Sequence, residues 1–216
     1  MRAIASRANW GGDMAPELLI ALVTFCFVSS VTPGPNNMML LSSGATFGFR
    51  RTVPHMIGIS AGCVVMVLLL GFGLAGIIGR FPWLYRALHI LSAAYLLYLA
   101  WRIATSVGVG GRSASARPLT PLDAAAFQWV NPKAWAMCLG ATTSFARPEH
   151  LTGDVILIAT VLALVGFPAI TLWAGGGTVV RHLLDRPRAL RTFNLVMAAL
   201  LVASLVPGLI ELAEMA

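Results

Sequence analysis

Apolar residues dominate this 216-residue chain in long runs, which short polar or basic segments separate. A helix needs about 20 predominantly apolar residues to cross the hydrocarbon core of a bilayer. We therefore predict a polar, disordered extension at residues 1–13, followed by six membrane-spanning segments. Their expected bounds are Leu18–Phe47, Val53–Ile78, Trp83–Ile103, Leu122–Phe145, Leu151–Val180 and Ala189–Leu209.

The first predicted span is interrupted by the segment Thr32-Pro33-Gly34-Pro35-Asn36-Asn37. Each proline lacks an N–H and clashes with a continuing helix, and the glycine between them tolerates dihedral angles that other residues avoid. We therefore expect about one unwound turn here. Unwound backbone at membrane depth is stable only where protein or a water-filled cavity satisfies its polar groups. The arginines before this span also fit a signal peptide, but the apolar sequence continues beyond the break.

A second interruption, Asn131-Pro132-Lys133, lies about a hundred residues later in the fourth predicted span. Residues 106–117, rich in Gly, Ser and Ala, form a linker between a first half (14–105) and a second half (118–216). Three spans in each half would place the halves in the membrane with opposite orientation. We predict an all-α integral membrane protein, with six transmembrane helices in an inverted three-plus-three repeat and with helices 1 and 4 broken.

Composition supports a membrane location. The chain is 58% hydrophobic and 11% charged, whereas soluble domains are about 25% charged. A net charge of +7 would suggest nucleic-acid binding in a soluble protein, but here the arginines lie between apolar segments and do not alternate with aromatic residues. We attribute them to loops held in the cytoplasm and expect no nucleic-acid partner.

The arginine distribution also predicts the orientation. Nine arginines follow the first, third and fifth spans, and five lie on the opposite side. Because cytoplasmic loops carry the excess of Lys and Arg, we expect the first group in the cytoplasm and both termini outside. The nine are Arg50, Arg51, Arg102, Arg112, Arg117, Arg181, Arg186, Arg188 and Arg191, and the five are Arg2, Arg7, Arg80, Arg86 and Arg147.

Lys133 is the candidate residue with the most specific chemistry. It follows Asp123 by ten positions, so it lies about 15 Å along the helix, near the middle of a core of about 30 Å. A charge there costs about 2.5 kcal/mol or more unless it faces a cavity or a partner. A structural lysine that binds the freed carbonyls and holds the broken helix is one interpretation. A role in binding substrate or transferring a proton is the interpretation that we favour.

Neutral amides and backbone breaks complete the candidate substrate site. Buried amides often only join transmembrane helices, but Asn36 and Asn131 adjoin the breaks, so we expect them to line the site. For Gln128 the two interpretations are equal. Cys26, Cys63 and Cys138 fit small buried hydrophobic residues better than disulfides or metal ligands. The site residues that we predict are Pro33, Gly34, Pro35, Asn36, Asn37, Gln128, Asn131, Pro132 and Lys133.

With these motifs in hand, the chain resembles the lysine-exporter (LysE/RhtB-type) family of bacterial amino-acid efflux proteins, over nearly all of Pro16 to Leu212. The family-like part begins near Met14, since the first thirteen residues depart from the pattern. The motifs that carry the resemblance are Thr32-Pro33-Gly34-Pro35-Asn36-Asn37, Gly48-Phe49-Arg50-Arg51, Ala93-Ala94-Tyr95-Leu96-Leu97-Tyr98-Leu99-Ala100-Trp101 and Asn131-Pro132-Lys133-Ala134.

The resemblance implies export of small amino acids or their derivatives across the bacterial cytoplasmic membrane, driven by proton influx. The first two motifs look most like the homoserine/threonine and cysteine/O-acetylserine branch. We expect no enzymatic activity and no cofactor or metal, since no Ser–His–Asp set, His–Cys cluster or acid pair converges within the spans. Efflux of a cation and a non-transporting scaffold remain alternatives. The oligomeric state stays open, a homo-oligomer included.

Overall fold

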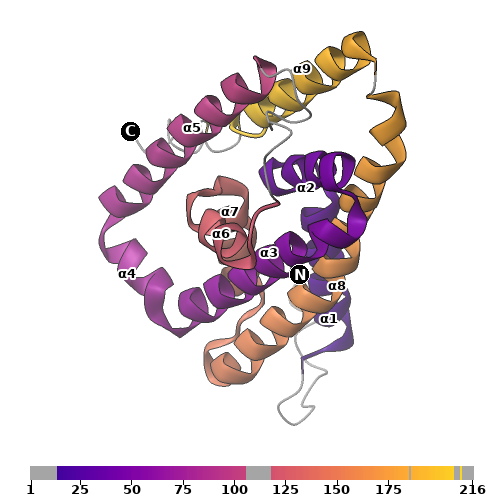
Figure 1. Cartoon of the computed structure of the whole chain (residues 1–216). Helices are drawn as coiled ribbons and strands as arrows, with labels where there is room; N and C mark the ends of the chain where they lie inside the picture. Colours follow the sequence, from indigo (N-terminus) through magenta and orange to yellow (C-terminus); the bar gives the residue numbers. More distant parts are fainter. Residues whose placement is uncertain (1–13, 106–117, 185, 207–209, 211–216) are drawn as a thin grey trace.

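The apolar runs fold as helices in the computed structural model of the chain, which describes residues 14–105, 118–184, 186–206 and 210. The extension predicted at 1–13 and the linker predicted at 106–117 lie outside the described residues. Every regular element in the described part is helical (Figure 1). The α-helices are α1 (Pro16–Val31), α2 (Pro35–Phe47), α3 (Phe49–Leu69), α4 (Ala75–Arg80), α5 (Pro82–Ala104), α6 (Pro121–Phe127), α7 (Pro132–Phe145), α8 (Leu151–Val180) and α9 (Pro187–Ala203).

The predicted break in the first span is present between α1 and α2. Thr32 leaves the helix in an extended conformation, and Gly34, with φ −179° and ψ 176°, precedes the first residue of α2, Pro35. The two helices meet at 55°. The prolines explain the break locally, because neither has an N–H to donate to the preceding turn and each disfavours a helical conformation in the residue before it.

The second break is also present. α6 begins at a capping box in which Thr120 and Asp123 satisfy each other's backbone N–H groups. It ends in a 3₁₀ turn, Gln128–Val130, and Asn131 is then extended, with φ −104° and ψ 105°, before α7 begins at Pro132. The fourth predicted span is therefore two helices joined at Asn131.

Glycines allow the long helix α8 to approach α2 closely. A Cβ atom added at Gly177 would lie 2.1 Å from the carbonyl oxygen of Leu41, and one added at Gly44 would lie 2.1 Å from that of Ala174. Because backbone atoms leave no room for a methyl group at either position, these glycines set the distance between the two helices. α8 also packs against α1 and α3.

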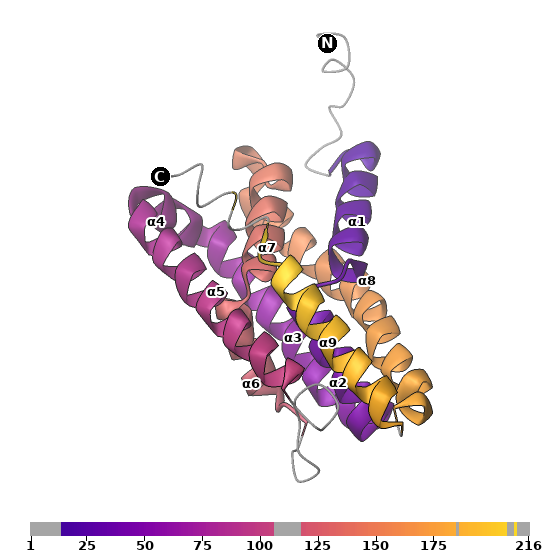
Figure 2. The ribbon, with the colours of Figure 1, turned by 90° about the horizontal axis from the view of Figure 1, so that it is seen from above.

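Small residues at Gly58 and Gly62 allow a second close approach, of α3 to α6. A Cβ at Gly58 would lie 2.2 Å from the carbonyl oxygen of Pro121, and one at Gly62 would lie 2.8 Å from Cα of Ala125. The remaining large contact joins α5 to α9, and these two helices run side by side away from α1 (Figures 1 and 2).

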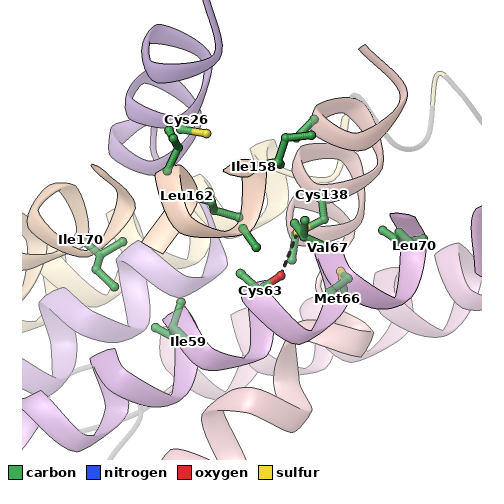
Figure 3. Packing of buried hydrophobic residues seen from close by; sticks show 14 of the residues in the cluster. Cys26, Ile59, Cys63, Met66, Val67, Leu70, Cys138, Ile158, Leu162 and Ile170 are labelled. Carbon is green, nitrogen blue, oxygen red and sulfur yellow. Dashed lines mark hydrogen bonds between the residues drawn. The ribbon is translucent and has the colours of Figure 1, made fainter. Parts of the chain in front are cut away.

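The main apolar core lies between α1, α3, α7 and α8 (Figure 3). All three cysteines are buried, as predicted, and each has a free thiol. The thiol of Cys138 donates a hydrogen bond of 3.7 Å to the carbonyl oxygen of Cys63. The residues labelled in Figure 3 show how the core is shared among the helices: Cys26, Ile59, Cys63, Met66, Val67, Leu70, Cys138, Ile158, Leu162 and Ile170.

Two helical stretches in the described part are long and apolar enough to cross a membrane alone, Phe49–Ile77 and Pro148–Val180. The bent pair α1–α2 counts as a third if it forms one span. α5 contributes the shorter apolar stretch Ile90–Trp101. The chain is thus a multi-pass membrane protein, and many large apolar side chains on its outer surface are exposed where lipid would cover them.

Two local features differ from or add to the prediction. The second span begins at Phe49 rather than Val53, because Gly48 adopts φ 81° and turns the chain directly from α2 into α3. Its far end contains a π-helical turn, Leu70–Leu74, where Gly73 has φ 137°. Both conformations favour glycine. Gly48 belongs to a motif named above, but Gly73 lies in an ordinary apolar run, so the sequence pattern did not single it out.

An ion pair fixes the turn between α7 and α8. Both carboxylate oxygens of Asp154 accept hydrogen bonds from the Arg147 guanidinium, at 2.7 and 2.8 Å, and one also accepts the backbone N–H of Arg147 at 2.9 Å. The Asp154 side chain is buried. Because this carboxylate satisfies three donors of a single residue, it holds the start of α8 against the end of α7.

Candidate functional site

The two helix breaks meet at a cavity of about 50 Å³. Five of the nine predicted site residues line it, and Pro33, Pro35, Gln128 and Pro132 adjoin those residues in the chain or lie behind them. The five are Gly34, Asn36, Asn37, Asn131 and Lys133. A cavity of this size holds only about one to three water molecules, so a bound amino acid would require side chains to move.

Lys133, the second residue of α7, reaches across to the end of α1. Its Nζ donates a hydrogen bond of 2.5 Å to the carbonyl oxygen of Thr32 and a longer one of 3.4 Å to that of Pro33. The side chain is half-buried. The hydrogen bonds to freed carbonyls are those expected of a lysine that only holds the broken helix together. The position of Lys133 on the cavity wall is what a substrate-binding lysine requires.

Gly34 makes room for this lysine. A Cβ atom added at Gly34 would lie 2.6 Å from Cδ and 3.2 Å from Nζ of Lys133. The backbone of Gly34 is extended, a conformation that any residue can adopt. Glycine is therefore needed here for the space it leaves to the lysine side chain and not for its own dihedral angles.

Other side chains satisfy the remaining carbonyl oxygens at the end of α1. Asn37 Nδ2 donates to Ser30 O at 2.9 Å and to Thr32 O at 2.6 Å. Trp173 Nε1, on α8, donates to Val31 O at 3.0 Å. Helix ends leave four carbonyls without intrahelical partners, so these neutral donors and Lys133 together stabilise the broken backbone.

A reciprocal amide pair forms the second link between the breaks. Asn36 Nδ2 donates to Gln128 Oε1 at 2.8 Å, and Gln128 Nε2 donates back to Asn36 Oδ1 at 3.1 Å. Gln128 is fully buried and also donates to Ala124 O at 2.8 Å. Asn36 lines the cavity while Gln128 lies behind it, so Gln128 positions Asn36 and joins α6 to α2.

Asn131 begins α7 as its N-cap. Its Oδ1 accepts the backbone N–H of Lys133 at 3.2 Å, which satisfies one of the N–H groups that the first turn of a helix leaves without a partner. Asn131 is buried and lies on the cavity wall. It therefore fixes the direction in which α7 starts, and hence where Lys133 points.

The opposite wall of the cavity was not predicted. It is formed by α3 and α8, together with parts of α1 and α7, and contains Ser29, Ser30, Ile59, Ser60, Cys63, Ala134, Met137, Leu162, Gly166, Phe167 and Ile170. In the sequence these residues belong to ordinary apolar runs, so nothing local distinguishes them from lipid-facing residues. Their role depends on the packing of α8 across both breaks.

The described lining residues determine what the cavity can bind. Lys133 supplies a cation, Asn36 and Asn131 supply amides, and none of the described lining residues is acidic. Within the described part of the chain, no group of three or more His, Cys, Asp or Glu side chains comes together to hold a metal ion. The chemistry suits a small polar molecule with a carboxylate better than a metal cation.

Comparison with known proteins agrees with this chemistry. The model of the LysE type translocator family matches residues 27–204, a region that contains both breaks. A cysteine/O-acetylserine efflux protein of Escherichia coli (strain K12) is 34% identical over 196 residues, which cover 88% of this chain and 96% of that protein. The protein of the same description in Salmonella typhimurium (strain LT2) is 34% identical over 195 residues, with the same coverage. No solved structure matches the chain.

Proposed function

Because the chain belongs to the LysE type translocator family, we propose that it exports small neutral amino acids or their derivatives across the bacterial cytoplasmic membrane. It is a transporter and not an enzyme. Cysteine and O-acetylserine, which appear in the names of similar proteins, are the first candidate substrates. Homoserine and threonine are the next candidates, because the motifs near the first break resemble those of the homoserine/threonine branch.

The observation that carries this proposal is the convergence of both helix breaks on one cavity that holds a cation, amides and freed carbonyls. A zwitterionic substrate needs a cationic partner for its carboxylate and oxygen acceptors for its ammonium group. Lys133 supplies the first, and the carbonyls of Thr32 and Pro33 supply the second. Asn36 and Asn131 add neutral polar contacts. Since the described lining has no acidic residue, substrates with a neutral side chain fit better than basic ones.

The proposed architecture is an inverted repeat of residues 14–105 and 118–216, in which the helix pair α1–α2 corresponds to α6–α7. Two observations support it. α3 packs against α6 as α8 packs against α1. Lys133 follows Pro132 as Asn36 follows Pro35. The Lys133 side chain reaches the end of α1, and the Asn36 side chain reaches Gln128 at the end of α6. Rocking of one repeat against the other would open the cavity to each side of the membrane in turn.

We propose proton influx as the driving force and the arginine-rich end as the cytoplasmic side. The start of α3, which carries Arg50 and Arg51, and the α8–α9 turn, which carries Arg186, lie at one end of the molecule, and α1 begins at the other (Figure 2). Lys133 is the basic residue in the described cavity lining, which makes it the candidate for exchanging a proton as substrate is bound and released.

Inside-out membrane vesicles test this function. Vesicles from cells with the protein should accumulate a radiolabelled substrate from a panel of cysteine, O-acetylserine, homoserine, threonine and lysine when respiration acidifies their lumen. Vesicles from cells without it should not, and a protonophore should abolish the accumulation. Absence of accumulation for every compound would contradict the proposal and favour a scaffold. Accumulation that survives the protonophore would contradict only the coupling.

A further inference from the structure

The end of α1 presents a cluster of carbonyl oxygens to donors of two kinds. Asn37 and Trp173 are neutral, and they bind Ser30 O, Val31 O and Thr32 O from α2 and α8. Lys133 is charged, and it binds Thr32 O and Pro33 O. The negative end of the dipole of α1 favours a cation at this place. The neutral donors are short or rigid side chains of packed helices, whereas the Nζ of Lys133 lies at the end of a long, flexible side chain.

Lys133 carries the same chemical group as the ammonium end of an amino acid. When a substrate binds between the breaks, the carbonyls of Thr32 and Pro33 that would accept its ammonium group already bind the Nζ of Lys133. The carbonyls of Thr32 and Pro33 are accessible, since both residues are exposed, so displacement needs only a rotation of the lysine side chain. The small volume of the cavity, about 50 Å³, also requires some side chain to leave before an amino acid enters.

We infer that the carbonyls of Thr32 and Pro33 form a subsite for primary ammonium groups, which Lys133 occupies in the absence of substrate and from which the substrate's ammonium displaces it. This inference rests on the proposed function for the identity of the substrate, but not for the existence of the subsite. The displaced Nζ stays within reach of the cavity because its stem starts at the first turn of α7, and it becomes the partner of the substrate carboxylate.

The inference explains how an empty site avoids leaving charges and acceptors without partners. Before binding, the lysine and the carbonyls satisfy each other. After binding, each has a partner on the substrate, so the number of ionic hydrogen bonds does not fall. An alkylammonium ion lacks the carboxylate, so its binding would displace the Lys133 ammonium from the two carbonyls without offering it a new partner, which is unfavourable. The wild-type protein should therefore discriminate strongly against simple amines.

Ammonium binding to a variant without the lysine tests the subsite directly. In the purified, detergent-solubilised Lys133→Met protein, the apolar stem is kept and the ammonium is lost, so the carbonyls are left without their cation. We expect methylammonium chloride to raise the melting temperature of this variant by about 3 °C or more at saturation. Tetramethylammonium chloride, which has no N–H to donate, should not raise it, and wild type should not distinguish the two salts.

A second variant keeps the test decisive if Lys133→Met does not fold. Gly34→Ala leaves the charge in place but puts a methyl group where the lysine stem lies, and its backbone conformation is compatible with alanine. It should fold and should also be stabilised more by methylammonium than by tetramethylammonium. Equal responses to the two salts in every variant that folds would overturn the subsite. Failure of the proposed function would instead appear as a lack of export by wild type, whatever the outcome with methylammonium.

Discussion

At the scale of single residues, Lys133 decides between a structural and a functional account of the cavity. Its hydrogen bonds to Thr32 O and Pro33 O would satisfy both accounts, since a structural lysine and a substrate-binding lysine each need an acceptor in the empty protein. The two accounts differ in what the positive charge contributes. A lysine that only links the helices acts as a hydrogen-bond donor and does not need its charge. A lysine that binds the substrate carboxylate must carry the positive charge.

Lys133→Gln separates these accounts, because it keeps a polar donor and removes the charge. Loss of a hydrogen bond to a charged group costs about 1.5–3 kcal/mol, which corresponds to roughly ten- to hundredfold in affinity. We expect normal membrane insertion and an apparent substrate affinity lower by this factor, measured as the concentration dependence of uptake into inside-out vesicles. Wild-type uptake in the variant would assign Lys133 to structure alone and leave the asparagines as the binding residues.

At the scale of elements, the break between α1 and α2 creates the acceptors that the site uses. In a continuous helix the carbonyl of Thr32 would accept the backbone N–H four residues later, that of Asn36. The break frees this oxygen for Asn37 and Lys133. The prolines on either side of Gly34 therefore act on the chemistry of the site through the backbone, although neither lines the cavity.

Replacing Pro33, Gly34 and Pro35 together with alanine should restore the helix. Alanine has the highest helix propensity and removes both steric blocks, so we expect a folded membrane protein whose substrate uptake is abolished. Size-exclusion chromatography and vesicle uptake check the two parts of this expectation. A monodisperse variant that transports at the normal rate would show that the unwound turn is not required for the site.

The crossing of α2 and α8 offers a matched pair of substitutions on one helix. Gly177→Ala places a methyl group 2.1 Å from Leu41 O, whereas no atom lies within 4 Å of a Cβ at Gly175. Overpacking of this kind costs about 1–3 kcal/mol, while Gly175→Ala gains up to about 1 kcal/mol of helix propensity. We expect Gly177→Ala to lower the melting temperature in detergent and Gly175→Ala to leave it unchanged or raise it. Equal melting temperatures would contradict the close crossing.

At the scale of the whole molecule, the features predicted from the sequence are those with local causes. Proline stereochemistry determines both breaks. The wall formed by α3 and α8 and the pairing of Asn36 with Gln128 depend on which helices meet. Such contacts join residues far apart in the sequence, so no pattern within one segment identifies them.

The central claim, that the substrate binds in the cavity between the two breaks, is tested most directly by protection of a cysteine on the cavity wall. Ser60→Cys is introduced into a transport-competent chain whose native cysteines are replaced by alanine, and its alkylation rate is measured with and without a transported, non-thiol amino acid. Glu149→Cys, on the exposed turn between α7 and α8, serves as the control.

The account predicts that substrate at ten times its Kd slows alkylation at position 60 by about tenfold and leaves the rate at position 149 unchanged. An amino acid that is not transported should protect neither position. Equal alkylation rates at position 60 with and without the transported amino acid would place the substrate elsewhere and contradict the account.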